Sequence, residues 1–383
     1  MKITKVEPII LYAQDPSMQG EANVGGYTGY QLIVRVDTDE GIHGWGEACV
    51  GSENGEAAYA VKELIDRGIT PRIKGENPVE YRRLWEQLYE ATYWYGRRGL
   101  ATYAMSAIDT ALVDIAGKAF GIPACQVLGG QYKKEIPLYA SLLFDMDDPE
   151  ATAKKGEKYA KLGYFGTKFG WGMIPSKPFG ADFKKDEEMV ATIREGIGPN
   201  TKLMIDVGRY VNWSVPYAVK MGKMVEKYDA FWFEEALPQD DLNGYAELAR
   251  SLDVPVAHGE ELYTVYDFNE VLKKKAADLW QPDASKVGGM SEMKRVIELA
   301  RINNIMWVPH NWSTAVNTAA SLHLSVSSPD GFLCEFKQEP NVLVHDLAKR
   351  PFRVENGKMQ VPSEPGLGLE INEKVLSKVR LDR

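Results

Sequence analysis

The chain has 383 residues, which is too many for one ordinary hydrophobic core, so we expect one barrel-sized domain and a smaller one. Hydrophobic residues make up 44% and charged residues 26% of the sequence, proportions that are typical of a soluble globular protein. The formal net charge is −9 and no block of Lys and Arg stands out, which argues against binding to nucleic acid or to a membrane surface.

The cysteines and the apolar runs indicate the kind of compartment. Cys49, Cys125 and Cys334 are far apart and odd in number, which excludes a disulfide framework and a zinc-ligand pattern. The first residues alternate like a strand and lack the basic and apolar segments of a signal peptide. No apolar run approaches the ~20 residues that a membrane helix needs. We therefore expect a soluble cytoplasmic protein.

Strand patterns open the chain and helical patterns follow them. Alternating apolar residues predict strands at 3–11, 30–37 and 42–47, the last two joined by a turn at Asp39-Glu40-Gly41. Apolar residues at helical spacing predict helices at 56–67, 78–91 and 99–120. Strands followed by helices indicate an α+β domain rather than a nucleotide-binding one. The segment 14–30, rich in Gly, Ser and Asn, could be a specificity lid or an ordinary surface loop.

A regular alternation of strand and helix begins after about residue 130. Short β-branched or aromatic runs recur at 136–141, 164–170, 203–207, 231–235, 254–259, 279–284, 305–310 and 332–336, and most gaps hold a polar amphipathic helix. Eight β-then-α units in this length are typical of a parallel (β/α)8-type barrel. We predict a capping domain at 1–125, a catalytic barrel at 126–350 and a segment 351–383, with strand-like pieces around 365–369, that returns to the capping domain.

Charged residues close the predicted barrel strands, where barrel enzymes carry their active sites. One acidic residue at a strand end would be an ordinary helix cap, but acids closing three consecutive strands, with other polar residues closing the rest, are hard to explain as caps. The strand-end residues are Lys168, Asp206, Glu234 with Glu235, Glu260, Asp283, His310 and Glu335.

Three of these acids predict a metal site. Asp206, Glu234 and Glu260 end neighbouring strands, so they would converge and raise one another's pKa unless a cation neutralised them. Ligation by oxygen alone, without clustered His or Cys, indicates Mg²⁺. Consecutive residues of a strand face opposite sides, so the pattern leaves open whether Glu234 or Glu235 is the ligand. It also leaves open the direction of His258.

The motifs at these strand ends resemble those of the enolase superfamily, specifically its mandelate racemase-like branch. The resemblance rests on TKFGW, FWFEEALPQDD, QPDASKVGG, PHNW and PGLGLEI in this order, and it covers nearly the whole chain. It implies a modified (β/α)7β barrel with a capping domain completed by the C-terminal tail, and self-association of the chain. It also implies one Mg²⁺ held by Asp206, Glu260 and the first residue of the glutamate pair, Glu234.

The resemblance further implies roles for the remaining strand-end residues. Lys168 would be an acid/base on one face of the substrate, and His310, paired with Asp283, would serve the other face. Glu335 would hydrogen-bond the substrate carboxylate as it becomes an enediolate; from the pattern alone it could instead pair with a buried Arg. The metal, with a Lys or His base, stabilises charge that develops when a proton is lost beside a carboxylate.

The sequence departs from its relatives at substrate-binding positions. The family often carries Lys-x-Lys on the second barrel strand, but here the first position is Gly166. The position two residues after Asp206, often a polar substrate contact, is Gly208, followed by Arg209. These changes argue against assigning the particular substrate of a relative to this chain.

We predict that the chain dehydrates a small-molecule sugar acid, an aldonate or aldarate, to a 2-keto-3-deoxy acid. The residues near the expected mouth suit a polyhydroxylated substrate: Trp171, Asn212, Trp213, Asn311 and Trp312. A racemase or epimerase acting at the α-carbon of a hydroxy acid is the alternative with the same fold. A decayed barrel that only binds other molecules is the alternative from another class.

Overall fold

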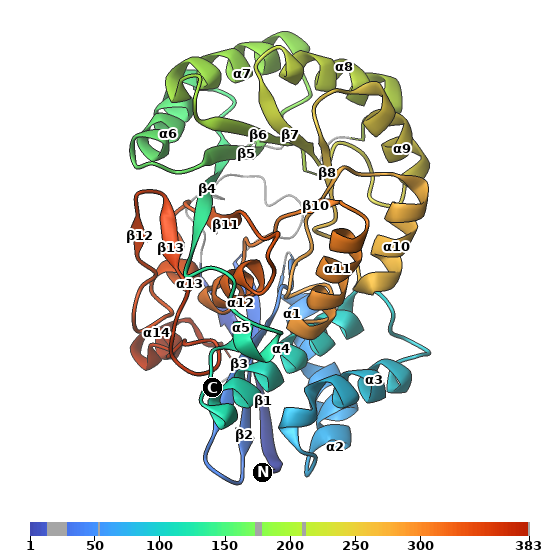
Figure 1. The fold of residues 1–383 in the computed structure, drawn as a ribbon, viewed down its shortest axis with the longest axis vertical. Helices are drawn as coiled ribbons and strands as arrows, with labels where there is room; N and C mark the ends of the chain where they lie inside the picture. Colours follow the sequence, from blue (N-terminus) through green and yellow to red (C-terminus); the bar gives the residue numbers. More distant parts are fainter. Residues whose placement is uncertain (14–28, 53, 173–177, 209–211, 382–383) are drawn as a thin grey trace.

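The structure is a computed structural model that describes residues 1–13, 29–52, 54–172, 178–208 and 212–381 (Figure 1). The possible lid lies almost wholly outside these residues, and Arg209 lies wholly outside them. Strands and helices of the first third, coloured blue to cyan, gather at one end of the molecule, and the alternating strands and helices occupy the rest. No helix among the described residues combines the length and the apolar character that a membrane span requires.

The capping region contains an antiparallel sheet in the order β1-β2-β3, as the alternation of residues predicts. Its strands are β1 (Ile3–Tyr12), β2 (Tyr30–Thr38) and β3 (His43–Ala48). The predicted turn joins β2 to β3, and Gly41 adopts φ 77°, which a glycine reaches without steric cost. The backbone N–H of Gly41 donates to Thr38 O at 3.2 Å, so the turn is closed by its own hydrogen bond.

One long helix covers this sheet. The helical segments are α1 (Glu56–Glu63), a π-helix (Leu64–Ile69), α2 (Thr70–Ile73), a 3-10 turn (Pro78–Glu80), α3 (Tyr81–Ala91), α4 (Leu100–Phe120) and α5 (Ala124–Val127). Helix α4 is apolar and buried along most of its length, and it packs on β3. A Cβ atom at Gly44 or Gly46 would collide with the backbone carbonyls of Ala111 and Ala107. These two glycines therefore allow the close approach of helix and sheet.

The barrel region alternates strands and helices as the sequence predicts. Its elements are β4 (Glu135–Phe144), α6 (Pro149–Lys161), β5 (Gly166–Gly172), α7 (Phe183–Ile197), β6 (Lys202–Asp206), α8 (Val215–Glu226), β7 (Ala230–Glu234), α9 (Leu242–Ser251), β8 (Val256–His258), α10 (Thr264–Lys274), β9 (Leu279–Trp280), α11 (Met290–Ile302), β10 (Met306–Trp307), α12 (Ala315–Val326) and β11 (Cys334–Lys337). Within the described residues, seven helices thus connect eight strands, the (β/α)7β order that the family resemblance implies. Side-chain caps begin several helices, such as Asp148 at α6 and Asp182 at α7.

The strands form a parallel sheet in the order β10-β9-β8-β7-β6-β5-β4, and β11 pairs parallel with β4 on the side opposite β5. A ladder between β10 and β11 is absent from the described residues. Side chains that point inward form a small apolar layer under the strand ends: Tyr139, Met204, Trp232, Ala257, Leu279, Val308 and Leu333. This layer gives the polar residues above it a closed, apolar floor.

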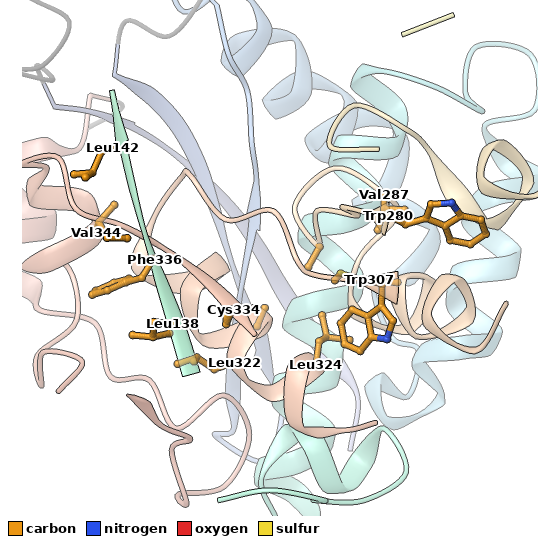
Figure 2. Close-up of a cluster of buried hydrophobic side chains, with 14 of the residues drawn as sticks. Leu138, Leu142, Trp280, Val287, Trp307, Leu322, Leu324, Cys334, Phe336 and Val344 are labelled. Atoms are coloured by element: carbon orange, nitrogen blue, oxygen red, sulfur yellow. The ribbon is translucent and has the colours of Figure 1, made fainter. Parts of the chain in front are cut away.

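A larger core lies between the strands and the helices. Figure 2 shows Leu138 of β4 near Phe336 and Cys334 of β11, with Leu322 of α12 beside them. Because β-strands of the barrel are covered on both faces, their residues are apolar on both sides, and the sequence shows continuous runs rather than alternation.

The C-terminal segment contacts both parts of the chain. Its elements are α13 (Val342–His345), β12 (Val354–Glu355), β13 (Lys358–Gln360) and α14 (Glu373–Val379). Strand β13 pairs antiparallel with the start of β4, whereas Arg380 bridges to Leu11 of the capping sheet. The predicted strand-like pieces at 365–369 are wrong: that segment makes only an isolated bridge, from Gly366 to Pro123, and the strands lie before it. The domain boundaries at 125 and 350 stay a prediction.

Candidate active site

Parallel pairing brings the predicted strand-end residues to one end of the barrel sheet. Gly170 of β5 is the register partner of Asp206, and Asp206 is the register partner of Glu234 at the end of β7. Glu260 follows β8, which pairs with β7. The carboxyl ends of adjacent parallel strands meet at one edge, so these side chains converge on the same space.

Asp206, Glu234 and Glu260 each offer an oxygen atom, and these atoms lie within 4.8 Å of one another. Asp206 Oδ1 accepts a hydrogen bond from Gly208 N at 3.0 Å, and Glu234 Oε2 accepts one from Trp232 Nε1 at 2.7 Å. Burial, and then the charge of Glu234, raise the pKa of Asp206 well above its usual value. Burial raises the pKa of Glu234 as well. Three crowded carboxylate oxygens with fixed orientations fit a divalent cation that prefers oxygen, such as Mg²⁺.

Glu235 points away from this group. Its carboxylate accepts hydrogen bonds from Gly259 N at 2.9 Å and from Tyr245 OH at 3.1 Å. It also lies 3.0 Å from His258 Nδ1, so the direction that the sequence left open for this histidine is toward Glu235. The two neighbouring glutamates therefore have different partners: Glu234 faces the other carboxylates, and Glu235 ties the end of β7 to β8.

Lys168 lies among the carboxylates rather than in a surface loop. Its Nζ is 2.5 Å from Glu234 Oε1, 3.1 Å from Glu335 Oε1 and 3.3 Å from Asp206 Oδ2. Its side chain is only 3% exposed. Burial alone lowers the pKa of Lys168, but the attraction of Glu234 and Glu335 outweighs it, so the pKa is raised well above the usual lysine value.

His310 and Asp283 form the predicted pair. His310 Nδ1 lies 2.6 Å from Asp283 Oδ2, and His310 Nε2 lies 3.3 Å from Glu260 Oε2. Burial alone lowers the pKa of His310, but Glu260, Glu335 and the Asp283 hydrogen bond raise it to about 9. Burial alone raises the pKa of Asp283, but the hydrogen bond and charge of His310, together with Lys286 and Ser285, outweigh burial and lower this pKa, so Asp283 stays ionised. The imidazole is thus held as a cation that can donate a proton.

Glu335 completes the group. Its Oε2 accepts a hydrogen bond from Asn311 N at 2.7 Å, and its Oε1 faces Lys168. The alternative of a buried arginine partner is wrong, because Lys168 is the cation beside it. The side chain of Glu335 is fully buried.

A pocket opens over these residues and is lined by Ser141, Leu142, Leu143, Lys168, Gly170, Trp171, Asp206, Glu260, His310 and Trp312. Trp171 and Trp312 line it as expected, but Asn212 is exposed and is not among its lining residues. Trp213 is not a mouth residue either: it is buried in the main core, with its ring 6.2 Å from that of Phe233. Ser141 lines the pocket although it was not predicted as a site residue: its only signal is that it closes the predicted run 136–141, and in the structure it lies within β4, paired with Lys168.

The space of the absent first lysine is filled. A Cβ atom at Gly166 would lie 2.6 Å from Lys202 O and 2.9 Å from Met204 Sδ. Met204 belongs to the apolar layer inside the barrel. A longer side chain at Gly166 would therefore have to displace this layer, so the pocket carries Lys168 without a second lysine beside it on β5.

Comparisons with known proteins place this architecture in a family. Residues 151–375 match the family described as enolase C-terminal domain-like, and residues 27–129 match the mandelate racemase / muconate lactonizing enzyme N-terminal domain. The chain is 30% identical over 392 residues to the D-galactarolactone cycloisomerase of Agrobacterium fabrum, which covers 100% of this chain and 99% of that protein. It is 31% identical over 360 residues to the D-xylonate dehydratase of Haloferax volcanii, which covers 89% of this chain and 83% of that protein.

A solved structure has the same fold. The racemase from Streptomyces coelicolor A3(2) with bound magnesium has a TM-score of 0.87 at 25% identity, over 99% of this chain and 100% of that one. The family match covers both the capping and the barrel regions, and it agrees with the strand order described above. The chain belongs to the mandelate racemase-like branch of the enolase superfamily.

Proposed function

We propose that the chain is a Mg²⁺-dependent dehydratase of a sugar acid, which removes the proton beside the carboxylate and expels the β-hydroxyl as water. The observation that carries this proposal is the presence of two proton-transfer groups, Lys168 and His310, in one pocket with the carboxylate cluster. The relatives named as sugar-acid dehydratases, such as the D-xylonate dehydratase, support the substrate class.

Asp206, Glu234 and Glu260 would hold the Mg²⁺, since their oxygens converge. The ion would supply Lewis-acid stabilisation of the charge that develops on the substrate carboxylate. A relative of known structure binds magnesium, which supports the choice of metal. Glu335 would hydrogen-bond the same carboxylate from the other side.

Lys168 would accept the α-proton, for which it must be an uncharged amine. Its pKa is raised by carboxylates, so neutralising these carboxylates removes the attraction that keeps Lys168 protonated. His310 would then give its proton to the departing β-hydroxyl as the C–O bond breaks, releasing water and an enol that tautomerises to the 2-keto-3-deoxy acid. Asp283 keeps the imidazolium oriented for this step through its 2.6 Å hydrogen bond.

A second candidate is ring opening by the same chemistry. The cycloisomerase from Agrobacterium fabrum matches this chain over its whole length, which favours this reaction as the alternative. Both reactions remove the α-proton and break the C–O bond at the β-carbon. In an open-chain acid the broken bond releases water, whereas in a cyclic substrate it only opens the ring, and no group leaves. A racemase would use the same two proton-transfer groups without breaking a C–O bond, and it is the alternative with the same fold. A non-catalytic barrel would need neither of these groups.

The test is a screen of aldonates, aldarates and their lactones with purified protein and Mg²⁺ in D₂O. Apart from the deuterium that enters at carbon when the enol tautomerises in D₂O, a dehydratase gives a 2-keto product that has lost one water, and a cycloisomerase gives a product that has lost none. An epimerase gives a new stereoisomer carrying deuterium at the α-carbon. If no acid showed Mg²⁺-dependent exchange of its α-proton, the proposal of an enzyme with this chemistry would be wrong. Self-association and a cytoplasmic location stay predictions.

A further inference from the structure

Glu47 of the capping sheet reaches across to the barrel and binds the start of helix α12. It lies near the end of β3 and is only 1% exposed. Its Oε1 accepts a hydrogen bond from Thr314 N at 3.0 Å, and its Oε2 accepts hydrogen bonds from Thr314 Oγ1 at 2.6 Å and from Asn317 N at 2.8 Å. Thr314 is the N-cap of α12, so the carboxylate also lies at the favourable end of the helix dipole.

The first turn of α12 in turn holds the proposed proton donor. Asn317 Nδ2 donates a hydrogen bond to Asp283 Oδ1 at 3.0 Å, and Ser285 Oγ donates to the same oxygen at 2.6 Å. The other oxygen, Asp283 Oδ2, is hydrogen-bonded to His310 Nδ1. Because Asn317 and Ser285 occupy one oxygen, the carboxylate cannot rotate freely, and the imidazole receives one fixed partner.

A second buried carboxylate also joins the capping region to the barrel, but within the described residues it is not connected to Asp283 and His310. Asp109 of α4 is also buried, and it accepts hydrogen bonds from Ser291 N at 2.8 Å and from Ser291 Oγ at 2.5 Å. Both carboxylates join the capping region to the start of a barrel helix. Ser291, however, has no hydrogen bond to Asp283 or His310 among those found in the described residues, so Asp109 provides a matched control.

We propose that Glu47 is a positioning residue for the proton donor: it fixes the first turn of α12, so that Asn317 holds Asp283 and Asp283 holds His310. The capping region would thus orient the barrel's acid through this chain of hydrogen bonds. The kinetic part of this inference rests on the proposed function, because it assigns His310 to the departure of the β-hydroxyl and Lys168 to the α-proton.

The kinetic test compares Glu47→Gln with Asp109→Asn and Asn317→Ala. In Glu47→Gln, the rate of dehydration should fall about 10- to 100-fold through misplacement of the acid, while α-proton exchange in D₂O stays close to the wild-type rate. Asn317→Ala should behave in the same way, and the double variant should be no slower than Asn317→Ala alone. Asp109→Asn should lower the melting temperature without changing the ratio of the two rates.

Equal losses of exchange and dehydration in Glu47→Gln, or no loss of either, would overturn the inference. A double variant much slower than Asn317→Ala would also overturn it, because Glu47 would then act by another route.

A second measurement needs no substrate, so it separates this inference from the proposed function. The proton shared by His310 Nδ1 and Asp283 should give a low-field ¹H NMR resonance, assigned by its disappearance in His310→Asn. The resonance should shift upfield or broaden beyond detection in Glu47→Gln and stay in place in Asp109→Asn. An unchanged resonance in Glu47→Gln would overturn the positioning role even if a substrate were never found. If the resonance responds but no acid is turned over, only the proposed function fails.

Discussion

Lys168 Nζ lies 2.5 Å from Glu234 Oε1, so the proposed base is ion-paired with a proposed metal ligand. The Lys168 ammonium group therefore provides part of the positive charge that a bound Mg²⁺ would provide to the carboxylates. A buried lysine with three carboxylate neighbours stabilises them electrostatically, and its removal leaves them to repel one another.

The first prediction concerns the competition between the Lys168 ammonium group and Mg²⁺ for the carboxylate cluster. Lys168→Met should bind Mg²⁺ about tenfold more tightly than wild type, because the competing charge is gone, while α-proton exchange falls by about 10²–10⁴-fold. Isothermal titration calorimetry and exchange in D₂O measure the two effects. Lys286→Met is the control: this lysine is equally buried but pairs with Glu261 at 2.7 Å, so Mg²⁺ affinity should not change. Weaker Mg²⁺ binding by Lys168→Met would contradict the assignment.

The second prediction separates the two adjacent glutamates. Glu234→Gln should weaken Mg²⁺ binding at least about tenfold, since it removes a charged oxygen from the cluster. Glu235→Gln should leave Mg²⁺ affinity unchanged but lower the free energy of unfolding by about 1–3 kcal/mol, because it disturbs the bonds to Gly259 and Tyr245. Calorimetric titration and urea unfolding of both variants provide the test. Equal effects of both substitutions on metal affinity would show that the geometry does not select the ligand.

The sequence could predict the order of the barrel because each strand is a short apolar run between helices, and it could predict the site because polar residues end those runs. It could not choose between Glu234 and Glu235, since both sides of a barrel strand are buried and alternation carries no information there. In the structure Glu235 adopts φ 48°, which ends the strand and turns its side chain toward β8. That turn depends on contacts with His258 that the local sequence does not reveal.

Two predictions that the structure contradicts failed for a similar physical reason, because the outcome depends on tertiary contacts. Strands β12 and β13 are only two and three residues long, so their formation depends on the pairing of β13 with β4 and of β12 with β13 rather than on a local pattern. Trp213 resembles a substrate-stacking residue in sequence, but its ring packs against Tyr217 and Phe233 in the core. A large aromatic residue after a strand can either contact a substrate or fill the hydrophobic core, and only its packing in the structure distinguishes these two roles.

The third prediction concerns the division of labour between the two proton-transfer groups. His310→Asn should reduce dehydration by about 10²–10⁴-fold, because the β-hydroxyl loses its proton donor, while α-proton exchange through Lys168 continues. Product formation by mass spectrometry and deuterium incorporation by NMR should be followed on the same sample. Exchange and dehydration lost together would indicate that His310 removes the α-proton itself, and loss of neither would remove it from the mechanism.

The fourth prediction concerns the position of the missing lysine. Gly166→Ala should lower the free energy of unfolding by about 1–3 kcal/mol, because its Cβ would press against Lys202 O and Met204. Gly68→Ala, whose Cβ would find its nearest atom at 3.4 Å, serves as a control and should not destabilise the protein. Thermal unfolding measures both. If Gly166→Lys were as stable as wild type, the barrel interior would have room for the second lysine of the relatives.

The last prediction follows from the raised pKa of His310 in the metal-free protein. A folded-state pKa of about 9 exceeds the ordinary value of 6.5, so the protonated ring stabilises the folded state. This contribution is complete below about pH 6.5 and is lost as the pH rises through about 9, and the difference corresponds to about 3 kcal/mol. Urea unfolding in the presence of EDTA, from about pH 6 to about pH 10, should show this loss for wild type.

His310→Gln removes the titrating group, so its unfolding free energy should lack this component of the pH dependence. The difference between wild type and variant should therefore shrink as the pH rises. His345→Gln is the control: burial lowers the pKa of His345, so this histidine does not lose a proton near pH 9, and the variant should keep the wild-type slope from about pH 8 to about pH 10. Parallel curves for wild type and His310→Gln would mean that Glu260, Glu335 and Asp283 do not hold a proton on His310, and the proposed acid would then have to be protonated by the substrate complex instead.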